Sequence, residues 1–269
     1  MSKDKNRNAT GASGADAISH QVDLDQRGVS VPDHKGTRYI GVLTRLHEWL
    51  APQSYFEIGT YTGESLSIAN CATVAVDPDF HLGTRDFLGK KPFCALYRMP
   101  SDTFFRQHDL TSIFDGPIDL AFLDGWHNCE YLLRDFANTE RHCRRNSVIA
   151  LHDCVPVEVA IAGRTPAPSL EPSRANWWAG DVWRTLLVLR KHRPDLAFTV
   201  IDSRPTGLAL ITNLDAQSAV LTDDYVKIVR EMMSLSLEQI GFEEFFSMIS
   251  LEPTSVIETK EKMAQRFWL

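Results

Sequence analysis

The hydrophobic residues first recur at the spacing of a helix and then gather in short runs typical of strands. Ile40, Leu43, Leu46 and Leu50 recur at helical spacing, which predicts a helix over Tyr39–Leu50 that ends before a proline. Short apolar runs follow, and polar, helix-compatible or turn-forming segments separate them. The predicted strands are Tyr55–Ile58, Thr73–Val76, Phe93–Arg98, Ile118–Leu123, Val148–Leu151, Ala197–Ile201 and Leu208–Thr212.

This alternation predicts an α/β fold with a Rossmann-like sheet of seven strands and helices on both faces. Helices are expected after Gly63, after Ser101 and after Asn128. The last two strands flank the turn-rich segment DSRPTG, so they are expected to form an antiparallel hairpin on an otherwise parallel sheet. The sheet is therefore mostly parallel, with one antiparallel strand.

The rest of the chain divides by composition. Residues 1–32 are polar and poor in large apolar groups, which predicts a mobile arm before the main domain at 33–214. Within that domain, the proline-rich stretch 156–181 is too long for a simple connector and is expected to lie on the substrate side. Residues 215–269 carry apolar residues at helical spacing and are expected to form a helical extension.

Charge and cysteine content narrow the classes of function. The formal net charge of -7 argues against a nucleic-acid partner, because such binding needs clustered basic residues. Five cysteines without a CxxC pair indicate neither a disulfide framework nor a zinc knuckle and fit a reducing cytoplasm. We find no apolar stretch long enough for a membrane span, so a cytoplasmic protein that acts on a small molecule is expected. The oligomeric state, a homo-oligomer included, stays open.

A glycine-rich turn follows the first predicted strand. The pattern Glu57-x-Gly59-x-x-x-Gly63 lets the backbone turn sharply and lets a ligand approach it, although such turns also occur without ligands. Asp77 ends the second strand about 20 residues later, where doubly wound folds bind a ribose; it is also a plausible turn-former before a proline. The dinucleotide pattern GxGxxG is absent, which disfavours a dehydrogenase.

Acidic and imidazole side chains follow the fourth and fifth predicted strands. Asp124, His127, His152 and Asp153 are expected to converge, because the carboxyl ends of neighbouring strands bind ligands in such sheets. Two carboxylates and an imidazole suit a divalent cation: Mg²⁺ for the oxygens, or Mn²⁺, Fe²⁺ or Zn²⁺ because of the histidine. The alternatives are a helix cap at His127 and a structural role for His152.

The run FEIGTYTGES at 56–65 resembles the first motif of the catechol O-methyltransferase-like branch of class I methyltransferases. The resemblance implies that Glu57 and Gly59 line S-adenosylmethionine, that Tyr61 packs beside it and that Ser65 holds its carboxylate. It also implies ribose binding by Asp77 and adenine contacts at Ser101 and Asp102, residues that are equally suited to cap a helix. Gly63 completes the cofactor turn.

The pattern D-G-x-H…H-D-C-x-P resembles small-molecule methyltransferases related to macrocin O-methyltransferase and cephalosporin hydroxylase. The resemblance implies that Asp124 and the pair His152–Asp153 bind the cation and that His127 is the general base, with Asp124 beside it. This chain departs from the family in the pair, which is commonly acidic, and Asp153–Cys154 is an alternative alignment.

Together these features predict an O-methyltransferase that acts on a hydroxyl of a small molecule, such as a sugar or secondary metabolite, with a divalent cation. A hydroxylase on the same fold and a non-catalytic module that binds S-adenosylmethionine or S-adenosylhomocysteine are the alternatives. A dehydrogenase is the weakest of the readings.

Overall fold

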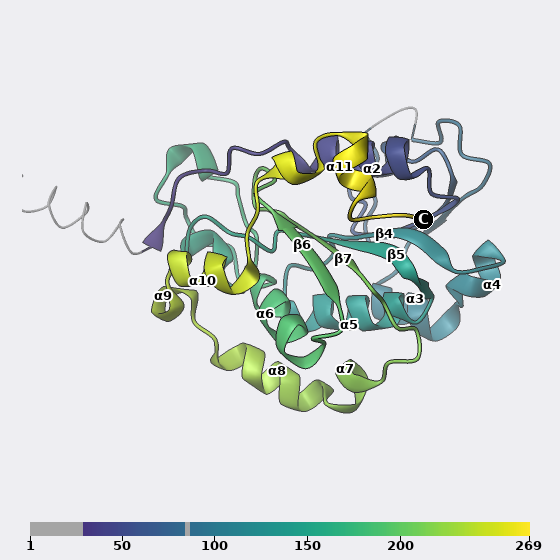
Figure 1. The fold of residues 1–269 in the computed structure, drawn as a ribbon. Coiled ribbons are helices and arrows are strands. Elements are labelled where there is room, and N and C mark those ends of the chain that lie inside the picture. Colours follow the sequence, from purple (N-terminus) through teal and green to yellow (C-terminus); the bar gives the residue numbers. More distant parts are fainter. Residues whose placement is uncertain (1–28, 84–86) are drawn as a thin grey trace, which may run out of the picture.

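The computed structural model describes residues 29–83 and 87–269, and its centre is a seven-stranded sheet (Figure 1). The strands are β1 (Ser54–Ile58), β2 (Ala72–Val76), β3 (Cys94–Tyr97), β4 (Ile118–Leu123), β5 (Cys143–His152), β6 (Ala197–Ile201) and β7 (Leu208–Thr212). Their order is β3-β2-β1-β4-β5-β7-β6. Only β7 runs against its neighbours β5 and β6, which confirms the predicted sheet with one antiparallel strand.

Helices cover both faces of the sheet, as predicted (Figure 1). On one face lies α2 (Tyr39–Leu50), which matches the predicted entry helix, together with α11 (Lys260–Ala264). The other face carries α5 (Cys129–Glu140) and α6 (Trp183–His192), with α3 (Ser101–Gln107) and α4 (Leu110–Phe114) towards the β3 edge. The helices expected after Ser101 and Asn128 are therefore confirmed.

The central strand β4 shows why the sheet is buried on both sides. All of its residues are buried. Leu120 and Phe122 pack in the hydrophobic cluster with α2, whereas Ala121 and Leu123 pack in the cluster with α5 and α6. Because side chains alternate across a strand, a sheet with helices on both faces favours apolar residues on both sides of such a strand.

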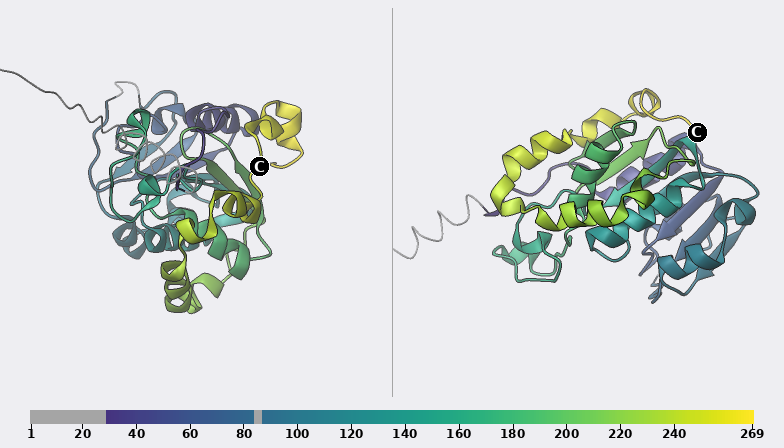
Figure 2. Two further views of the ribbon diagram at one scale, coloured as in Figure 1. Left: turned by 90° about the vertical axis from the view of Figure 1, so that its left-hand side faces the viewer. Right: turned by 90° about the horizontal axis from the view of Figure 1, so that it is seen from below.

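The residues after β7 form the predicted helical extension, which wraps around the β6 edge (Figure 2). Its elements are α7 (Val220–Asp223), α8 (Tyr225–Ser234), α9 (Leu237–Ile240), α10 (Phe242–Ile249), the 3₁₀ helix η4 (Thr254–Ile257) and α11. Trp183 of α6 packs edge-on against Phe245 of α10, with ring centroids 5.5 Å apart. The backbone of Glu252 then pairs with Val200 and Asp202, so the extension also covers the outer edge of the sheet.

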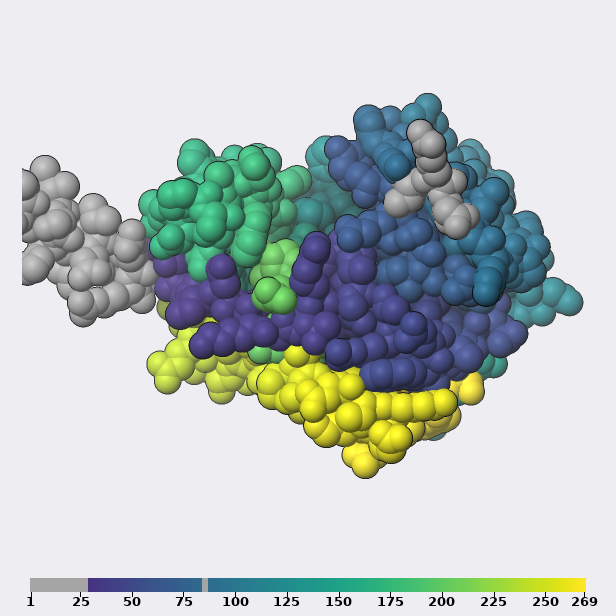
Figure 3. Space-filling model, turned by 90° about the horizontal axis from the view of Figure 1, so that it is seen from above, coloured from purple at the N-terminus to yellow at the C-terminus, as the bar shows by residue number. Residues whose placement is uncertain are grey.

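The N-terminal segment crosses the outside of the domain before α2 begins. Residues 1–28 of the predicted arm lie outside the described residues. Beyond them, Val31 N donates to Val157 O at 2.8 Å, and Val159 N donates to Val29 O at 2.7 Å. Figure 3 shows this purple segment running between the green 156–181 loop and the yellow C-terminal helices.

The 156–181 stretch is irregular but contains two short 3₁₀ helices, η2 (Ala160–Ala162) and η3 (Pro172–Arg174). Arg174 is buried and binds Asp33 of the N-terminal segment through its Nε at 2.7 Å. Its Nη2 also donates to Val31 O at 2.7 Å. The loop is therefore held in place by the segment that precedes α2. None of the helices in 29–83 and 87–269 has both the length and the apolar character needed to cross a bilayer.

Candidate active site

The predicted cofactor turn and the predicted cation ligands meet at the carboxyl ends of β1, β4 and β5, which are neighbours in the sheet. Gly59 follows β1 with a φ of +85°, and a β-carbon there would lie 1.9 Å from the carbonyl oxygen of Asp124. Asp124 N in turn donates to Ile58 O at 2.9 Å. Glycine at position 59 is thus required by the approach of a neighbouring backbone, which the sequence alone did not indicate.

The turn itself is tight. Tyr61 and Gly63 also have positive φ, at 42° and 80°, and Gly63 N donates to Thr60 O at 2.8 Å. The helix predicted after Gly63 is wrong: only the 3₁₀ turn η1 (Leu66–Ile68) follows. Residues 64–71 must bring the chain back to the start of β2, which lies beside β1. So short a connection leaves room for a single helical turn. Ser65 is buried at the start of η1, and no α-helix N-terminus stands behind the glycines.

Asp77 ties this turn to the end of β2. Its Oδ2 accepts from Tyr61 N at 2.8 Å and its Oδ1 accepts from Asp79 N at 2.7 Å. The carboxylate is buried, whereas the Tyr61 side chain is 60% exposed. Asp77 therefore holds the backbone of the glycine turn, and a contact with a ribose would have to use its remaining lone pairs.

Glu57 lies below the turn and is fully buried. Tyr55 donates its hydroxyl to Oε2 at 2.5 Å, and Oε1 has no hydrogen-bond partner among the described residues. Burial raises the pKa of the Glu57 carboxyl to about 7, although the hydroxyls of Tyr55, Thr60 and Ser65 oppose this. A buried oxygen without a hydrogen-bond partner costs free energy. A polar ligand group in the turn that donates a hydrogen bond to Oε1 would remove this cost.

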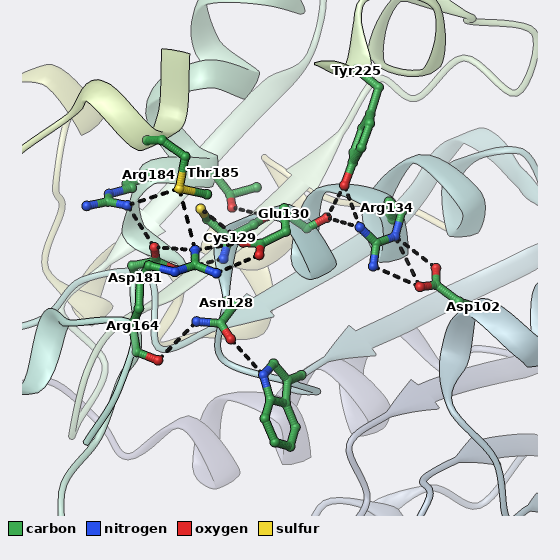
Figure 4. A network of polar contacts seen from close by, with 12 residues as sticks. Asp102, Asn128, Cys129, Glu130, Arg134, Arg164, Asp181, Arg184, Thr185 and Tyr225 are labelled. Atoms are coloured by element: carbon green, nitrogen blue, oxygen red, sulfur yellow. Dashed lines mark hydrogen bonds and ion pairs between the residues drawn. The ribbon is translucent and has the colours of Figure 1, made fainter. Parts of the chain in front are cut away.

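Ser101 and Asp102 form the first turn of α3, after β3. Arg134 of α5 binds the Asp102 carboxylate through Nε at 2.9 Å and Nη2 at 2.8 Å, and also donates to the Tyr225 hydroxyl of α8 (Figure 4). The structure thus places Asp102 in an ion pair that joins α3, α5 and α8. The predicted adenine contact at Ser101 and Asp102 stays a prediction.

The four acidic and imidazole residues come together as the sequence predicts. His127 Nε2 lies 3.3 Å from Asp124 Oδ1 and 3.3 Å from Asp153 Oδ2. His152 Nδ1 lies 3.2 Å from Asp124 Oδ1 and 3.3 Å from Asp153 Oδ1. Each histidine therefore faces both carboxylates, and the donor atoms form a closed ring. Candidate ligand atoms of Asp124, His152 and Asp153 all lie within 4.8 Å of one another.

Electrostatics in this ring favour charged imidazoles in the absence of a cation. Burial lowers the pKa of His127, but Asp153 and Asp124 outweigh it and raise that pKa to about 9. The same two carboxylates raise the pKa of the buried His152 to about 10. The histidines in turn hold the pKa of Asp124 well below its usual range, despite its burial. A base role for His127 at neutral pH therefore requires that its proton be displaced first.

Three residues that the sequence analysis did not select surround the ring. The Tyr39 ring lies 4.1 Å from that of His152, the backbone oxygen of Trp178 lies 2.8 Å from His127 Nδ1, and Thr206 donates its hydroxyl to Asp153. They come from α2, the 156–181 loop and the β6–β7 turn. The sequence indicated these three segments, but not that their residues would contact the ring.

A second group of potential ligands, Cys129, Glu130 and Asp181, lies nearby but is already neutralised (Figure 4). Arg164 donates to Glu130 at 2.6 Å and to Asp181 at 3.0 Å, and Arg184 donates to Asp181 at 2.8 Å. Burial raises the pKa of the Cys129 thiol to about 12, so a thiolate is disfavoured. This group acts as an anchor that fastens the 156–181 loop to α5.

The strand order, with its single antiparallel strand, is that of the class I methyltransferase fold, and the glycine turn follows β1. Residues 56–154, from the cofactor turn to the end of the β5 motif, match a family model described as a methyltransferase domain. The fold is therefore that of class I methyltransferases, and the segment 56–154 is similar to a methyltransferase domain.

Solved structures with low sequence identity resemble the chain. A putative O-methyltransferase from Klebsiella pneumoniae shares 16% identity, with 76% of this chain and 92% of that chain covered and a TM-score of 0.47. An O-methyltransferase from Bacillus cereus in complex with SAH shares 14% identity, with 74% and 89% covered and a TM-score of 0.46. The SAH-bound Podospora anserina methyltransferase PaMTH1 shares 13%, with 78% and 100% covered and a TM-score of 0.47. No curated protein sequence matches the chain.

Proposed function

We propose that this protein transfers the methyl group of S-adenosylmethionine to a hydroxyl group of a small molecule, with the help of a divalent cation. The observation that carries the proposal is the backbone contact between Gly59 and Asp124, which puts the cofactor turn directly beside the Asp–His ring. A methyl donor bound at the turn and an acceptor oxygen bound at the ring would then be neighbours. Methyl transfer requires that arrangement, because its rate depends mainly on placing the two reacting atoms in line.

The residues proposed to hold the cofactor are those of the turn and its supports. Glu57, with its unpaired buried Oε1, and the exposed ring of Tyr61 offer a polar and a flat apolar contact. Ser65 is proposed for the carboxylate of the cofactor, and Asp77 for its ribose, alongside the backbone contacts that Asp77 already makes. Ser101 and Asp102 are proposed on the adenine side.

Asp124, His152 and Asp153 are proposed to hold the cation, and the donor set of two carboxylates and an imidazole fits such an ion. A bound cation lowers the pKa of a coordinated hydroxyl and so supplies an oxyanion as the nucleophile at neutral pH. The chain's own residues orient this oxygen towards the cofactor turn. Acceptors that bring oxygen to such a site are hydroxylated small molecules, which is why transfer to oxygen is proposed. The role of His127 as the general base stays a prediction.

The proposed location is the cytoplasm, since all five cysteines are free thiols. Nucleic-acid and membrane partners form no part of the proposal, and homo-oligomerisation is left to measurement.

The test is a calorimetric titration of the purified protein with S-adenosylhomocysteine, with and without Mg²⁺ or Mn²⁺. Micromolar binding would support the cofactor assignment and justify a screen of hydroxylated acceptors that detects the demethylated cofactor product. If a folded sample bound nothing in either condition, the methyltransferase proposal would be wrong.

A further inference from the structure

We infer that His127 is a ligand of the cation through its Nε2, so that the site is a set of two carboxylates and two imidazoles that selects a first-row transition ion over Mg²⁺. This inference rests on the proposed function in one respect, namely that a cation binds at the ring. It goes beyond it in assigning a second nitrogen ligand and the class of the ion.

A backbone contact fixes the tautomer of His127. Its Nδ1 lies 2.8 Å from the backbone oxygen of Trp178, and a carbonyl oxygen only accepts hydrogen bonds. The proton of the neutral ring must therefore reside on Nδ1, which leaves the Nε2 lone pair directed at Asp124 and Asp153. Histidines that bind metals typically donate their other ring N–H to a carbonyl or carboxylate in this way.

Neighbouring residues hold His127 rigidly in this position. A β-carbon on Gly180, which has a φ of +69°, would lie 1.8 Å from the backbone oxygen of His127 and 2.4 Å from its β-carbon. Asp181 N donates to the same oxygen at 3.1 Å, and the Trp178 ring packs on the imidazole with centroids 5.2 Å apart. A residue that must swing to collect a proton would gain nothing from such confinement, whereas a metal ligand would be preorganised by it.

The donor atoms of the ring are spaced closely enough to surround an ion. Neighbouring ligands in a tetrahedral or octahedral shell stand about 3 Å apart when each is bound at roughly 2.0–2.2 Å. Both distances from His127 Nε2 to a carboxylate oxygen are 3.3 Å, and the corresponding distances from His152 Nδ1 are 3.2 and 3.3 Å. Both imidazoles thus contact Asp124 and Asp153, although only Asp124, His152 and Asp153 offer ligand atoms that all lie within 4.8 Å of one another. Coordination by His127 would therefore draw its Nε2 closer to the other three donors.

The nature of the donors decides the class of the ion. Mg²⁺ prefers oxygen ligands and keeps several waters, whereas imidazole nitrogens favour ions such as Fe²⁺, Co²⁺ and Zn²⁺. Two neutral imidazoles beside two carboxylates would also balance the charge of a divalent ion. In the loaded protein both nitrogens of His127 would be engaged, so His127 would not serve as the base that removes the acceptor's proton.

The test uses the full chain without an affinity tag, stripped of metal with a chelator, in four forms: wild type, His127→Gln, His152→Gln and His192→Gln. His192 pairs with Glu231 between α6 and α8, away from the ring, and so controls for the loss of any histidine. Co²⁺ affinity is read from its visible absorption, and the number of nitrogen ligands from the superhyperfine splitting of bound Cu²⁺ in paramagnetic resonance spectra. Titration with S-adenosylhomocysteine and circular dichroism check each variant's integrity.

We expect wild type and His192→Gln to show two coupled nitrogens, and each ring variant to show one with at least tenfold weaker Co²⁺ binding. Millimolar Mg²⁺ should not displace Co²⁺ from the wild type. The inference is overturned if His127→Gln keeps both the affinity and the two-nitrogen spectrum. If the variant does not fold, the wild-type spectrum alone decides, because one coupled nitrogen excludes two imidazole ligands.

Failure of the proposed function would look different. A wild-type protein that binds no S-adenosylhomocysteine but binds Co²⁺ through two nitrogens would retain the metal site and lose the methyltransferase assignment. A protein that binds S-adenosylhomocysteine but no transition ion would overturn this inference while leaving the cofactor assignment intact.

Discussion

Gly59 and Asp124 are in contact through their backbones: a β-carbon on residue 59 would come within 1.9 Å of the Asp124 carbonyl oxygen and 2.3 Å of its carbonyl carbon. The turn after β1 and the acidic residue after β4 are therefore one structural unit. Any side chain at position 59 must push Asp124 away, and with it the ring of donors that Asp124 shares with His127 and His152.

Gly59→Ala should consequently lose both stability and cation binding. Gly241 is the matched control, since its φ of +78° is close to the +85° of Gly59 but an added β-carbon would meet nothing within 4 Å. Gly241→Ala should cost about 1–3 kcal/mol, because its φ of +78° and ψ of 153° lie in a region that essentially only glycine adopts. Gly59→Ala should cost at least about 2 kcal/mol more, because the backbone must also move. Urea denaturation of both variants measures the difference, and equal losses would contradict the contact.

Asp153→Asn should weaken cation binding at least tenfold and leave the affinity for S-adenosylhomocysteine within about twofold of wild type. Asp153 belongs to the ring, whereas the glycine turn lies between β1 and β2. Asn tolerates the positive φ of 59° at this position as Asp does. Asp115, with a φ of 55° at the end of α4, supplies the control Asp115→Asn, which should change neither affinity. Calorimetry with each ligand separates the two effects, and unchanged cation binding in Asp153→Asn would remove it from the ligand set.

Asp77→Ala should weaken binding of S-adenosylhomocysteine at least tenfold, because it frees the amides of Tyr61 and Asp79 that hold the cofactor turn in shape. Asp79→Ala is the neighbouring control: its exposed carboxylate pairs with His81 and Arg98 at the surface, and its loss should leave the affinity nearly unchanged. Hydrogen exchange at the Tyr61 amide should accelerate only in the Asp77 variant. Protection retained there would mean that the turn does not depend on Asp77.

The elements best predicted from the sequence are those whose spacing is set by burial on one or both faces. The bounds of α2, β4, β6 and β7 agree with the prediction. In contrast, β5 begins at Cys143, before the predicted Val148, because exposed Arg144 and half-buried Asn146 interrupt its apolar pattern while the backbone is already extended. The helix expected after Gly63 is missing for a reason of chain length, which no local propensity reveals.

In the candidate site, too, some features could be predicted from the sequence and others could not. Asp124 and Asp153 could be placed together from the sequence because both follow parallel neighbouring strands. The contacts of Tyr39, Trp178 and Thr206 could not, since each joins segments that are far apart in the chain and no spacing rule relates them. The actual partner of Gly59, the Asp124 backbone, was hidden for the same reason.

Asp135 of α5 provides a prediction on pH. The side chain is buried behind the site and lines a small cavity with Leu123 and Gly125. Burial raises the pKa of its carboxyl to about 7, and Asp102 adds to this effect, whereas Ser101 and Arg134 oppose it. The folded protein therefore keeps a proton at Asp135 that the unfolded chain releases near pH 4.

The sign of the pH effect follows from this difference. Between about pH 4 and 7 the folded state binds more protons than the unfolded chain, so this carboxyl makes the free energy of unfolding fall as the pH rises. Asp135→Asn removes the ionisation while keeping the shape of the side chain. The stability of the variant relative to wild type should therefore rise by about 2–3 kcal/mol between pH 5 and 8. The change occurs over roughly two pH units, from pH 5 to the folded pKa of about 7, at 1.36 kcal/mol for each. Urea denaturation of both proteins at several pH values, without cofactor or cation, measures this difference. If it stayed constant over that range, Asp135 would already be ionised in the folded protein at pH 5.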